Sequence, residues 1–395
     1  MKTKKMVYVS NMCSEKKLQE LFQENFHGVP QQIQRYHRIL VDGLSKREHF
    51  QLDVLSALPI TKNNSSLKKA PKDLQRENGI SYHYLATINS PLWKRMGDFL
   101  GGFFHVISCK QIDTILVVDI LDVCVVLGAI FAAKIKKIPI IGIVTDIPDY
   151  LFVIGKMHAK LANKNIQLCD AYILLTKQMN KIVNPTNKKP YIVMEGHVPS
   201  EETAEVDVEN YEKNTEFVCL YAGILDKRYG VADLVQGFLL AKLPNARLDL
   251  YGEGAYKEEI IELASKHPQI RYQGVKQNKE IVLEEKKASL LINPRPSTEE
   301  FVKYSFPSKN LEYMVSGTPV LTTSLPGMPE EYKEYVYQIE EESSAGIAKM
   351  LTLIFSKTEE EQRNFGKRAK NFVKTYKSAD AQARKVEDFV RKNYE

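Results

Sequence analysis

Short β-rich runs alternate with stretches long enough for a helix, and this pattern occurs in two series along the chain. The first series of β-rich runs lies at 6–10, 51–57, 81–86, 114–118, 138–144 and 171–176. The second series lies at 216–223, 246–252, 270–274, 288–294 and 318–323. Such alternation is typical of a parallel sheet that helices cover on both faces. The sequence therefore predicts an α/β protein with two doubly wound domains in series.

An acidic stretch separates the two series. Residues 195–215 show little apolar periodicity, which indicates a linker. A chain of 395 residues also exceeds what one hydrophobic core usually organises. We predict an N-terminal domain over 1–195 and a C-terminal domain over 196–372. Residues 373–395 are predicted to form a helix that crosses back onto the first domain.

Composition limits the compartment and the partners. The five cysteines are scattered and form no Cys-x-x-Cys pair, which argues against a disulfide framework or a zinc knuckle. The N-terminal apolar run is too short for a signal peptide. The most apolar stretch, 115–133, contains Asp119 and Asp122 and predicts a buried strand followed by a helix. We expect a cytoplasmic protein whose net charge of +6 permits an anionic partner without indicating nucleic acid.

Strand ends in the second series carry candidate ligand residues, because open parallel sheets bind ligands at the carboxyl ends of their strands. Gly223 ends the first of these strands, and Lys227 and Arg228 follow it in a loop that suits a phosphate. Solvated cations on an ordinary loop are the alternative. Gly274 and Val275 follow a later strand, where they could lie beside a base or a sugar or form only a turn.

The stretch 303–321, KYSFPSKNLEYMVSGTPVL, predicts a helix that begins near Pro307 or Ser308. The free N–H groups at such a helix start form an anion site. Ser305 and Ser308 offer hydroxyls beside it, and Lys309 offers a point charge for a diphosphate.

Glu312 lies further along the same predicted helix. Its carboxylate could accept hydrogen bonds from both hydroxyls of a ribose. The alternative is that Ser308 is only a helix cap and that Glu312 only compensates the helix dipole.

These motifs resemble the donor-site signature of the retaining family-4 glycosyltransferases, also called glycosyltransferase group 1, which have the GT-B fold. That fold has two Rossmann-like domains that face a cleft, and the second holds the nucleotide-sugar. The resemblance implies that Glu312 holds the ribose, that Ser305 and Lys309 meet the diphosphate, and that Gly274 and Val275 lie by the base. The matching donor motif comprises Tyr304, Ser305, Phe306, Ser308, Lys309 and Glu312.

The chain departs from the family pattern in its acidic residues. The family's usual pair of glutamates would place its first member at Tyr304. Either that role is lost, or an insertion places Glu299 or Glu300 at the donor sugar, and we favour Glu300. The first domain of the family often carries a His-Asp pair, where this chain has Asp146 without a histidine. Asp146 is our catalytic candidate there, with a helix cap or turn residue as the alternative.

Two cations of the family pattern are also replaced. Ile224 and Tyr229 stand where the family typically has an arginine and a lysine. The candidates for compensation are Lys227, Arg228, Lys303 and Lys309. In the first domain, Gly28 precedes an amphipathic helix and resembles the glycine loop that closes over donor phosphates or the acceptor. His37, on that helix, is predicted to be a surface or cap histidine.

The expected chemistry needs no metal. The chain has no Asp-x-Asp motif, and cations together with a helix N-terminus can stabilise a departing phosphate. We expect no cofactor besides a nucleoside-diphosphate sugar as co-substrate, with UDP favoured. Because no unambiguous nucleophile is present, same-face attack by the acceptor is the favoured route to retention over a carboxylate nucleophile.

Residues 90–108 bear on the acceptor, a saccharide. This stretch holds Trp93 next to Lys94 and Arg95, with several Phe and Leu, which is typical of a surface that rests on anionic lipid. The alternative is a buried crossover helix with a basic edge. The first interpretation predicts peripheral contact with the inner face of the cell membrane and a lipid-linked acceptor, as in bacterial capsule or other surface polysaccharide synthesis. A soluble acceptor is the other possibility.

Two other functions fit the same pattern. A sugar-nucleotide 2-epimerase of similar fold would bind the same donor but release a free epimer without an acceptor. A non-catalytic partner subunit would bind the sugar nucleotide without transferring it, and Tyr304 favours this alternative.

Overall fold

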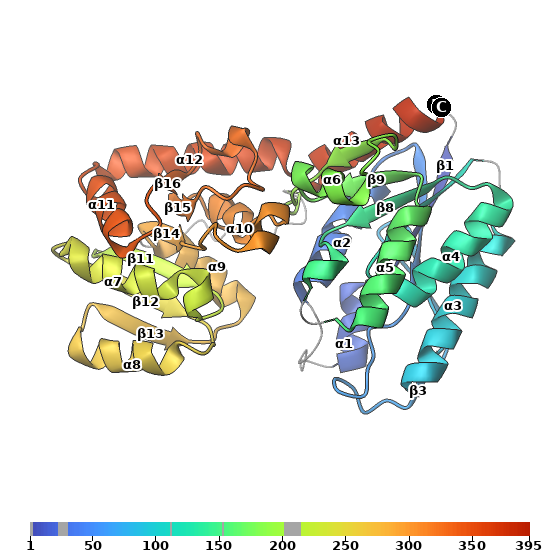
Figure 1. Cartoon of the computed structure of the whole chain (residues 1–395), viewed down its shortest axis with the longest axis horizontal. Coiled ribbons are helices and arrows are strands. Elements are labelled where there is room, and N and C mark those ends of the chain that lie inside the picture. Colours follow the sequence, from blue (N-terminus) through green and yellow to red (C-terminus); the bar gives the residue numbers. More distant parts are fainter. Residues whose placement is uncertain (1–2, 23–30, 111–112, 152–153, 201–214) are drawn as a thin grey trace. The chain divides into compact units, whose positions relative to one another are not determined.

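The computed structural model describes most of the chain. The described residues are 3–22, 31–110, 113–151, 154–200 and 215–395. They form two compact units, of which unit 1 comprises Met1–Pro199 with Ser378–Glu395 and unit 2 comprises Ser200–Lys377 (Figure 1). The units therefore divide a few residues after the predicted boundaries at 195 and 372. Most of the predicted acidic linker lies outside the described residues.

Unit 1 is built on an eight-stranded sheet with the order β10-β9-β8-β7-β1-β2-β5-β4. Its strands are β1 (Lys4–Ser10), β2 (Phe50–Ser56), β4 (Asp73–Glu77), β5 (Ile80–Tyr84), β7 (Thr114–Asp119), β8 (Ile140–Val144), β9 (Ala171–Leu174) and β10 (Tyr191–Val193). Each predicted β-rich run of the first series overlaps one of these strands, and β4 and β10 were not predicted. The prediction of a wholly parallel sheet is wrong at one edge, where β4 pairs antiparallel with β5. The sequence of β4, DLQRE, is that of a polar edge strand and has no apolar run to reveal it.

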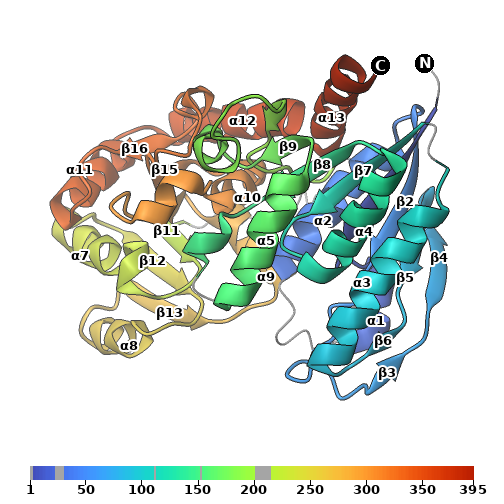
Figure 2. The ribbon, with the colours of Figure 1, turned by 45° about the vertical axis from the view of Figure 1, so that its right-hand side comes forward.

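Helices cover both faces of this sheet. They are α1 (Glu15–Phe22), α2 (Gln31–Ser45), α3 (Pro91–Ser108), α4 (Val123–Lys136), α5 (Lys156–Leu168), α6 (Asn180–Val183) and α13 (Ala379–Tyr394). Helices α3, α4 and α5 lie side by side on one face (Figure 2). The core on the other face joins Leu40 and Leu44 of α2 to Val386 and Phe389 of α13. The C-terminal helix therefore belongs to unit 1.

The C-terminal helical region is interrupted once. Helix α12 (Glu359–Tyr376) belongs to unit 2 and ends just before Ser378. The Ser378 hydroxyl accepts a hydrogen bond from the backbone N–H of Ala381 and so caps α13. A backbone bridge between Val198 and Ser378 lies next to this cap. The chain thus leaves unit 1 and returns to it at adjacent points.

Unit 2 contains a six-stranded parallel sheet with the order β13-β12-β11-β14-β15-β16. Its strands are β11 (Phe217–Ala222), β12 (Ala246–Tyr251), β13 (Ile270–Gly274), β14 (Leu290–Asn293), β15 (Val320–Thr323) and β16 (Tyr337–Ile339). Besides α12, its helices are α7 (Val231–Ala241), α8 (Lys257–Lys266), α9 (Asn278–Lys287), α10 (Ser308–Ser316) and α11 (Ser344–Phe355). Each predicted β-rich run of the second series contains one strand, and only β16 was not predicted.

The strand order reverses once in each sheet. In unit 1 the reversal lies between β1 and β7, and in unit 2 it lies between β11 and β14. Ligands of open α/β sheets bind beside such a switch point, at the carboxyl ends of the strands. The loops after these four strands are therefore the places where functional side chains are expected.

The apolar stretch 115–133 forms most of β7 and the first part of α4, and both elements are largely buried. This confirms the predicted strand followed by a helix. No helix in the described part of the chain is both long and apolar enough to cross a bilayer.

Candidate active site

The switch point of unit 2 brings together two predicted residues from distant parts of the chain. Gly223 directly follows β11, and a Cβ atom at this position would overlap the Nζ atom of Lys309. That Nζ atom also lies 5.5 Å from the ring centroid of Tyr221. The ammonium group of Lys309 therefore occupies the space that a side chain at position 223 would fill. The structure places a cation where a ligand of the sheet is expected.

Helix α10 is fixed to the strand ends by buried polar groups. The Asn310 side chain donates to Oγ1 of Thr322, at 3.2 Å, and accepts from Nδ2 of Asn293, at 2.8 Å. These partners belong to β15 and β14, respectively. The Tyr313 hydroxyl lies 3.1 Å from the backbone nitrogen of Ala222 in β11. Because α10 is anchored in this way, its N-terminal end with its partial positive charge stays at the carboxyl edge of the sheet.

Lys309 is shielded from solvent, and this affects its charge. Burial lowers the pKa of Lys309, while the nearby carboxylates of Glu312 and Glu285 act in the opposite direction. An ammonium group with reduced hydration interacts strongly with an anion. The site therefore suits a phosphate more than a neutral ligand.

The start of α10 confirms the predicted helix start near Pro307 or Ser308. The helix begins at Ser308, and Pro307 occupies the N-cap position without a side-chain capping bond. The alternative that Ser308 is only a helix cap is therefore wrong, because a cap residue lies outside the helical conformation and Ser308 is already helical. Its side chain is exposed. Ser305, two residues before the cap, donates a long hydrogen bond of 3.5 Å from Oγ to the carbonyl of Val302.

The other residues of the donor motif have different environments. Phe306 is buried, with its ring centroid 5.1 Å from that of Tyr332, so its side chain packs in the core. Tyr304 is half-buried and ends the short helix η4 (Glu300–Tyr304). Glu312 is half-buried in the second turn of α10. The structure thus assigns Phe306 a packing role, while the ligand roles of the other two stay predictions.

Glu300, the candidate at the donor sugar, is the first residue of η4. Its carboxylate pairs with Lys303 at 2.6 Å, and both side chains are about half exposed. Neighbouring Glu299 is close enough to influence the charge of Arg228. The choice between the two glutamates stays a prediction.

Lys227 and Arg228, the cations predicted for phosphate, are already paired with carboxylates. Arg228 forms two hydrogen bonds to Asp226, from Nε at 3.1 Å and from a terminal nitrogen at 2.9 Å, and its side chain is 75% exposed. Lys227 lies 3.7 Å from Glu259 and 5.1 Å from the ring centroid of Tyr256. These contacts agree better with the alternative of solvated loop cations.

Arg295 is a cation at the switch point that the sequence analysis did not select. It follows β14, and its Cζ atom lies 5.6 Å from the ring centroid of Tyr229 and 4.9 Å from that of Phe301. Its charge also acts on the hydroxyl of Tyr221, the residue beneath Lys309. Arg295 directly follows a predicted strand run, 288–294. The run itself predicts only a strand. The position of Arg295 at the switch point follows from the strand order, which places β14 beside β11.

Gly274 and Val275 lie at the carboxyl edge, two strands away from β11. Gly274 has a φ of +74°, a left-handed conformation that favours glycine, and Val275 is 66% exposed. Gly252, at the end of the intervening strand, would clash with the backbone of Gly223 if it carried a side chain. The carboxyl edge of the sheet is therefore exposed to solvent at Val275 and closely packed beside Gly223. The predicted contact with a base is not tested by this geometry.

The switch point of unit 1 is occupied by amide and carboxyl groups. Asn11, directly after β1, donates from its backbone and side chain to Asp122, with 2.7 Å between Nδ2 and Oδ1. Gln34 of α2 donates to Oδ1 of Asn11 at 2.8 Å. Burial raises the pKa of Asp122, and the charge of Asp119 raises it further. Asp122 can therefore hold a proton more readily than an ordinary aspartate.

His37 corrects another prediction. It is fully buried rather than a surface or cap residue. Its Nδ1 atom lies 2.5 Å from the Tyr8 hydroxyl, and its Nε2 atom lies 3.0 Å from a carboxylate oxygen of Asp119. The apolar spacing of α2 predicted an amphipathic helix, but it did not show that this histidine would meet polar partners on the sheet.

Asp146 and Gly28 were the predicted site residues of the first domain. Asp146 is half-buried in a bend directly after β8, the strand next to β7, so it shares the carboxyl edge with Asn11 and Asp122. Its catalytic role stays a prediction. Gly28 lies outside the described residues.

Helix α3, residues 91–108, has an unusual distribution of side-chain size. Its inner face contains Gly102, where a Cβ atom would overlap the backbone of Val125 in α4. Gly128 of α4 would likewise clash with the backbone of Phe99. The two helices thus pack backbone to backbone, which leaves the large residues of α3 outside.

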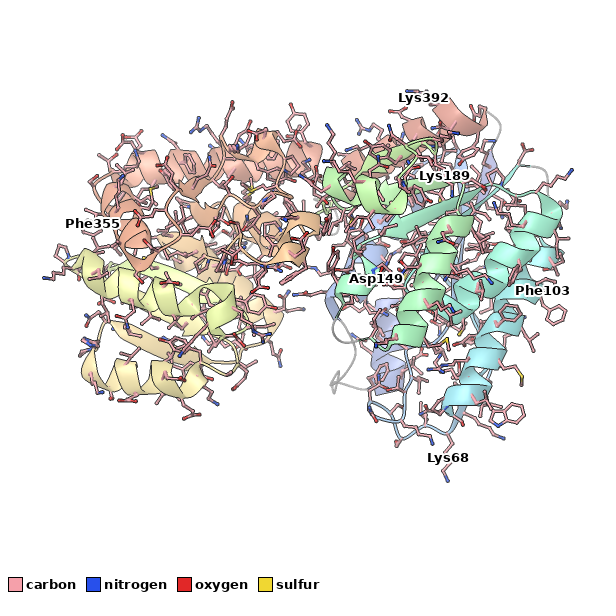
Figure 3. The ribbon with its side chains drawn as sticks, in the orientation of Figure 1. Lys68, Phe103, Asp149, Lys189, Phe355 and Lys392 are labelled. Carbon is pink, nitrogen blue, oxygen red and sulfur yellow. The ribbon has the colours of Figure 1, made fainter. Side chains whose placement is uncertain are left out.

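The outer side of α3 is apolar and exposed. We define the apolar face of α3 as Leu92, Trp93, Met96, Leu100 and Phe104, which are between 42% and 73% exposed. Exposed Arg95 lies on the same helix, and Lys69 pairs through the backbone with Ile88 just before it. In Figure 3, Phe103 points outward from α3 and Lys68 extends beyond its end. The prediction of a buried crossover helix is therefore wrong.

Comparisons with known proteins agree with this architecture. Residues 203–372 match the family described as Glycosyl transferases group 1. No curated protein matches the chain. Among solved structures, the sucrose-phosphate synthase from Thermosynechococcus elongatus is 12% identical, with a TM-score of 0.64 over 98% of both chains.

Two further solved structures have similar values. HepE from Anabaena, in complex with UDP, is 12% identical, with a TM-score of 0.62 over 98% of this chain and 100% of that chain. The lipopolysaccharide outer core galactosyltransferase WaaB is 13% identical, with a TM-score of 0.61 over 98% of this chain and 99% of that chain. At these identities the likeness establishes the fold alone, and that fold is GT-B.

Proposed function

We propose that this chain, a glycosyltransferase of the GT-B fold whose C-terminal part matches the group 1 family, transfers a sugar with retention from a nucleoside-diphosphate sugar to a saccharide acceptor. The observation that carries the proposal is the position of Lys309 against Gly223 at the switch point of unit 2. A half-buried cation and a helix N-terminus converge there, and both favour the binding of a diphosphate.

The leaving diphosphate would be stabilised by residues of unit 2. Lys309 and the N–H groups at the start of α10 supply positive charge, with Ser305 and Ser308 as hydroxyl donors. Such fixed charges can act without a metal ion. We therefore expect transfer to persist in EDTA at temperatures where the chain stays folded, and restoration of lost activity by magnesium would contradict this expectation. UDP is our favoured nucleotide, because HepE binds it.

Retention would follow from attack by the acceptor on the same face that the phosphate leaves. The departing phosphate can then take the acceptor proton, so no protein nucleophile is needed. We assign Glu300 to the donor sugar and Asp146 to the acceptor side. In unit 1, Asn11 and Asp122 offer amide and carboxyl groups suited to sugar hydroxyls.

The acceptor is proposed to be lipid-linked, as an intermediate of a bacterial surface polysaccharide. The apolar face of α3 with its neighbouring cations suits an anionic bilayer. Lys94, on the inner side of the same helix, donates to the carbonyl of Leu58 just beyond β2, at 2.9 Å. Helix α3 therefore begins at the carboxyl edge of the sheet, where an acceptor is expected. We propose a cytoplasmic protein that rests on the inner face of the membrane.

The test is a comparison of nucleotide binding by wild type and Glu312→Gln. Charged hydrogen bonds are worth roughly 1.5 to 3 kcal/mol, so the variant should bind UDP about ten to a hundredfold more weakly. It should lose less affinity for 2′-deoxy-UDP, which already lacks one hydroxyl partner. Glu258→Gln, an exposed change on α8, is the matched control and should leave both affinities unchanged.

The outcomes separate the proposal from its alternatives. Equal losses for the two nucleotides, or a lower melting temperature without weaker binding, would make Glu312 a structural helix residue. Release of a free epimer from a sugar nucleotide without acceptor would indicate a 2-epimerase. Donor binding with neither transfer nor hydrolysis would indicate a non-catalytic subunit.

A further inference from the structure

Three side chains from different elements of unit 1 converge on the face of the sheet that α3 covers. They are Asp53 of β2, His83 of β5 and His105 of α3, and their ligand atoms all lie within 4.8 Å of one another. The strand register aligns Leu55 with His83, so Asp53 and His83 point to the same face. The rings of His83 and His105 meet edge to face, with centroids 4.8 Å apart.

One atom of the cluster lacks a partner that a bound ion would supply. The Nε2 atom of His105 is buried and has no hydrogen-bond partner among the described residues. Buried polar atoms nearly always have a partner, and an exception indicates a bound water or ion. The carboxylate of Asp53 is buried as well, at 6% exposure. An ion bound between them would give the Nε2 atom of His105 a partner and would share the Asp53 carboxylate with Lys5.

The charges around the cluster are mixed. The Nζ atom of Lys5 lies 2.6 Å from one carboxylate oxygen of Asp53, and its side chain is 32% exposed. Burial lowers the pKa of His83, and the nearby cations Lys72 and Arg76 lower it further. Burial and the neighbouring His83 lower the pKa of His105 to about 4. His105 is therefore neutral at neutral pH, and Lys5 can turn toward solvent when another cation binds Asp53.

We propose that Asp53, His83 and His105 bind one divalent transition-metal ion such as zinc. Two imidazole nitrogens and one carboxylate suit zinc better than magnesium or calcium, which prefer oxygen ligands. The three residues would leave one tetrahedral position for water. The ion would join β2, β5 and α3, and so fix the helix that carries the apolar face. This site takes no part in the proposed sugar transfer and does not depend on it.

The experiment measures zinc binding by the full chain. Protein dialysed against EDTA and then against metal-free buffer is titrated with zinc chloride by calorimetry, and bound zinc is counted after gel filtration. We expect one ion per chain for the wild type. His83→Gln and His105→Gln should each weaken zinc binding about a hundredfold or more, since each removes a ligand. His49→Gln, a more exposed histidine of the same unit, is the matched control and should bind like wild type.

Two results would overturn the proposal. One is the absence of stoichiometric zinc from the wild type, and the other is equal zinc binding by wild type and the two ligand variants. If a variant fails to fold, cobalt binding by the wild type decides instead. The absorption spectrum of bound Co²⁺ distinguishes a tetrahedral site from the octahedral ion in water. A spectrum identical to that of free cobalt would also overturn the proposal.

Discussion

The two switch points of this protein have the same topology but opposite chemistry. In unit 2, the strand ends meet Lys309, Arg295 and the N-terminal end of α10, so the site is positive. In unit 1, they meet Asn11 and Asp122, which offer amide and carboxyl groups. A positive site suits a diphosphate, and a site of carboxyl and amide groups suits neutral hydroxyls. The difference teaches that one sheet topology can present opposite chemistry through its loop residues alone, as the proposed donor and acceptor sites would require.

The outer surfaces of the units differ as well. In unit 1, five large apolar residues share the apolar face of α3. In unit 2, exposed apolar residues such as Leu240, Ile261 and Leu353 belong to different helices. Contiguous apolar patches mark interaction sites, whereas single exposed residues are normal. This contrast makes unit 1, rather than unit 2, the unit to which the proposed membrane contact belongs.

The largest effect is expected from removing the apolar face. We expect the triple variant Leu92→Ser, Trp93→Ser and Phe104→Ser to bind anionic vesicles at least about a hundredfold more weakly, because each buried apolar side chain contributes roughly 1.5 to 3 kcal/mol when fully buried. Vesicle co-sedimentation measures the change.

The matched control replaces Leu240, Ile261 and Leu353 by serine in unit 2. It removes as many exposed apolar side chains without touching α3, and it should bind vesicles like wild type. Equal loss in both triple variants would remove the assignment of membrane contact to unit 1.

The next effect concerns the cation of unit 2. Lys309→Met should weaken UDP binding about a hundredfold, because charged hydrogen bonds contribute up to roughly 3 kcal/mol. It should not lower the melting temperature, since burial disfavours the charged lysine in the folded state. Calorimetry and thermal denaturation check the two parts. Lys227→Met, at a more exposed lysine, is the control, and equal losses of UDP affinity would contradict the role of Lys309.

Acid should affect the units differently. Burial lowers the pKa of His197, which belongs to unit 1, to about 4. A histidine of the unfolded chain titrates near pH 6.5, so between pH 6.5 and 4 the unfolded state binds more protons at this residue. Stability therefore falls as pH falls through this window, by up to about 3 kcal/mol for fully buried His197. Burial raises the pKa of Asp42 to about 6 and also raises the pKa of Asp122, and both carboxyls have the opposite effect as pH falls.

Hydrogen exchange by mass spectrometry can follow each unit separately. We expect exchange in unit 1 to accelerate more than in unit 2, whose single histidine is His267. His197→Gln should make the stability of unit 1 less dependent on pH. Faster acid-induced exchange in unit 2 would contradict this account.

Sequence predicted unit 2 better than unit 1 because the signals of unit 2 are local. A strand glycine, a proline and a lysine at a helix start lie within short motifs, and the structure brings Gly223 and Lys309 together. In unit 1, the pair Asn11 and Asp122 joins positions that only the strand order makes neighbours. His37 was misassigned for the same reason. Hydrophobic periodicity predicts which face of a helix is buried, but it does not predict which polar side chains of the sheet contact that face.

Arg295 provides the finest test of the comparison, because it is the residue of unit 2 that topology alone revealed. Its guanidinium lies over Tyr229 and Phe301, and its charge acts on Tyr221, next to Lys309. We expect it to supply part of the charge that the family's arginine and lysine would give at Ile224 and Tyr229.

Arg295→Gln should weaken UDP binding about tenfold, which corresponds to about 1.4 kcal/mol, and it should leave uridine binding unchanged because uridine lacks the phosphates. The control is Arg228→Gln. Arg228 is 75% exposed and bound to Asp226, and surface pairs of this kind contribute little. Calorimetry at low and high salt measures both variants, and the contribution of the better shielded Arg295 should survive salt that screens Arg228. If Arg228→Gln loses more UDP affinity than Arg295→Gln, then the phosphate lies at the loop that the motif indicated, not at the switch point.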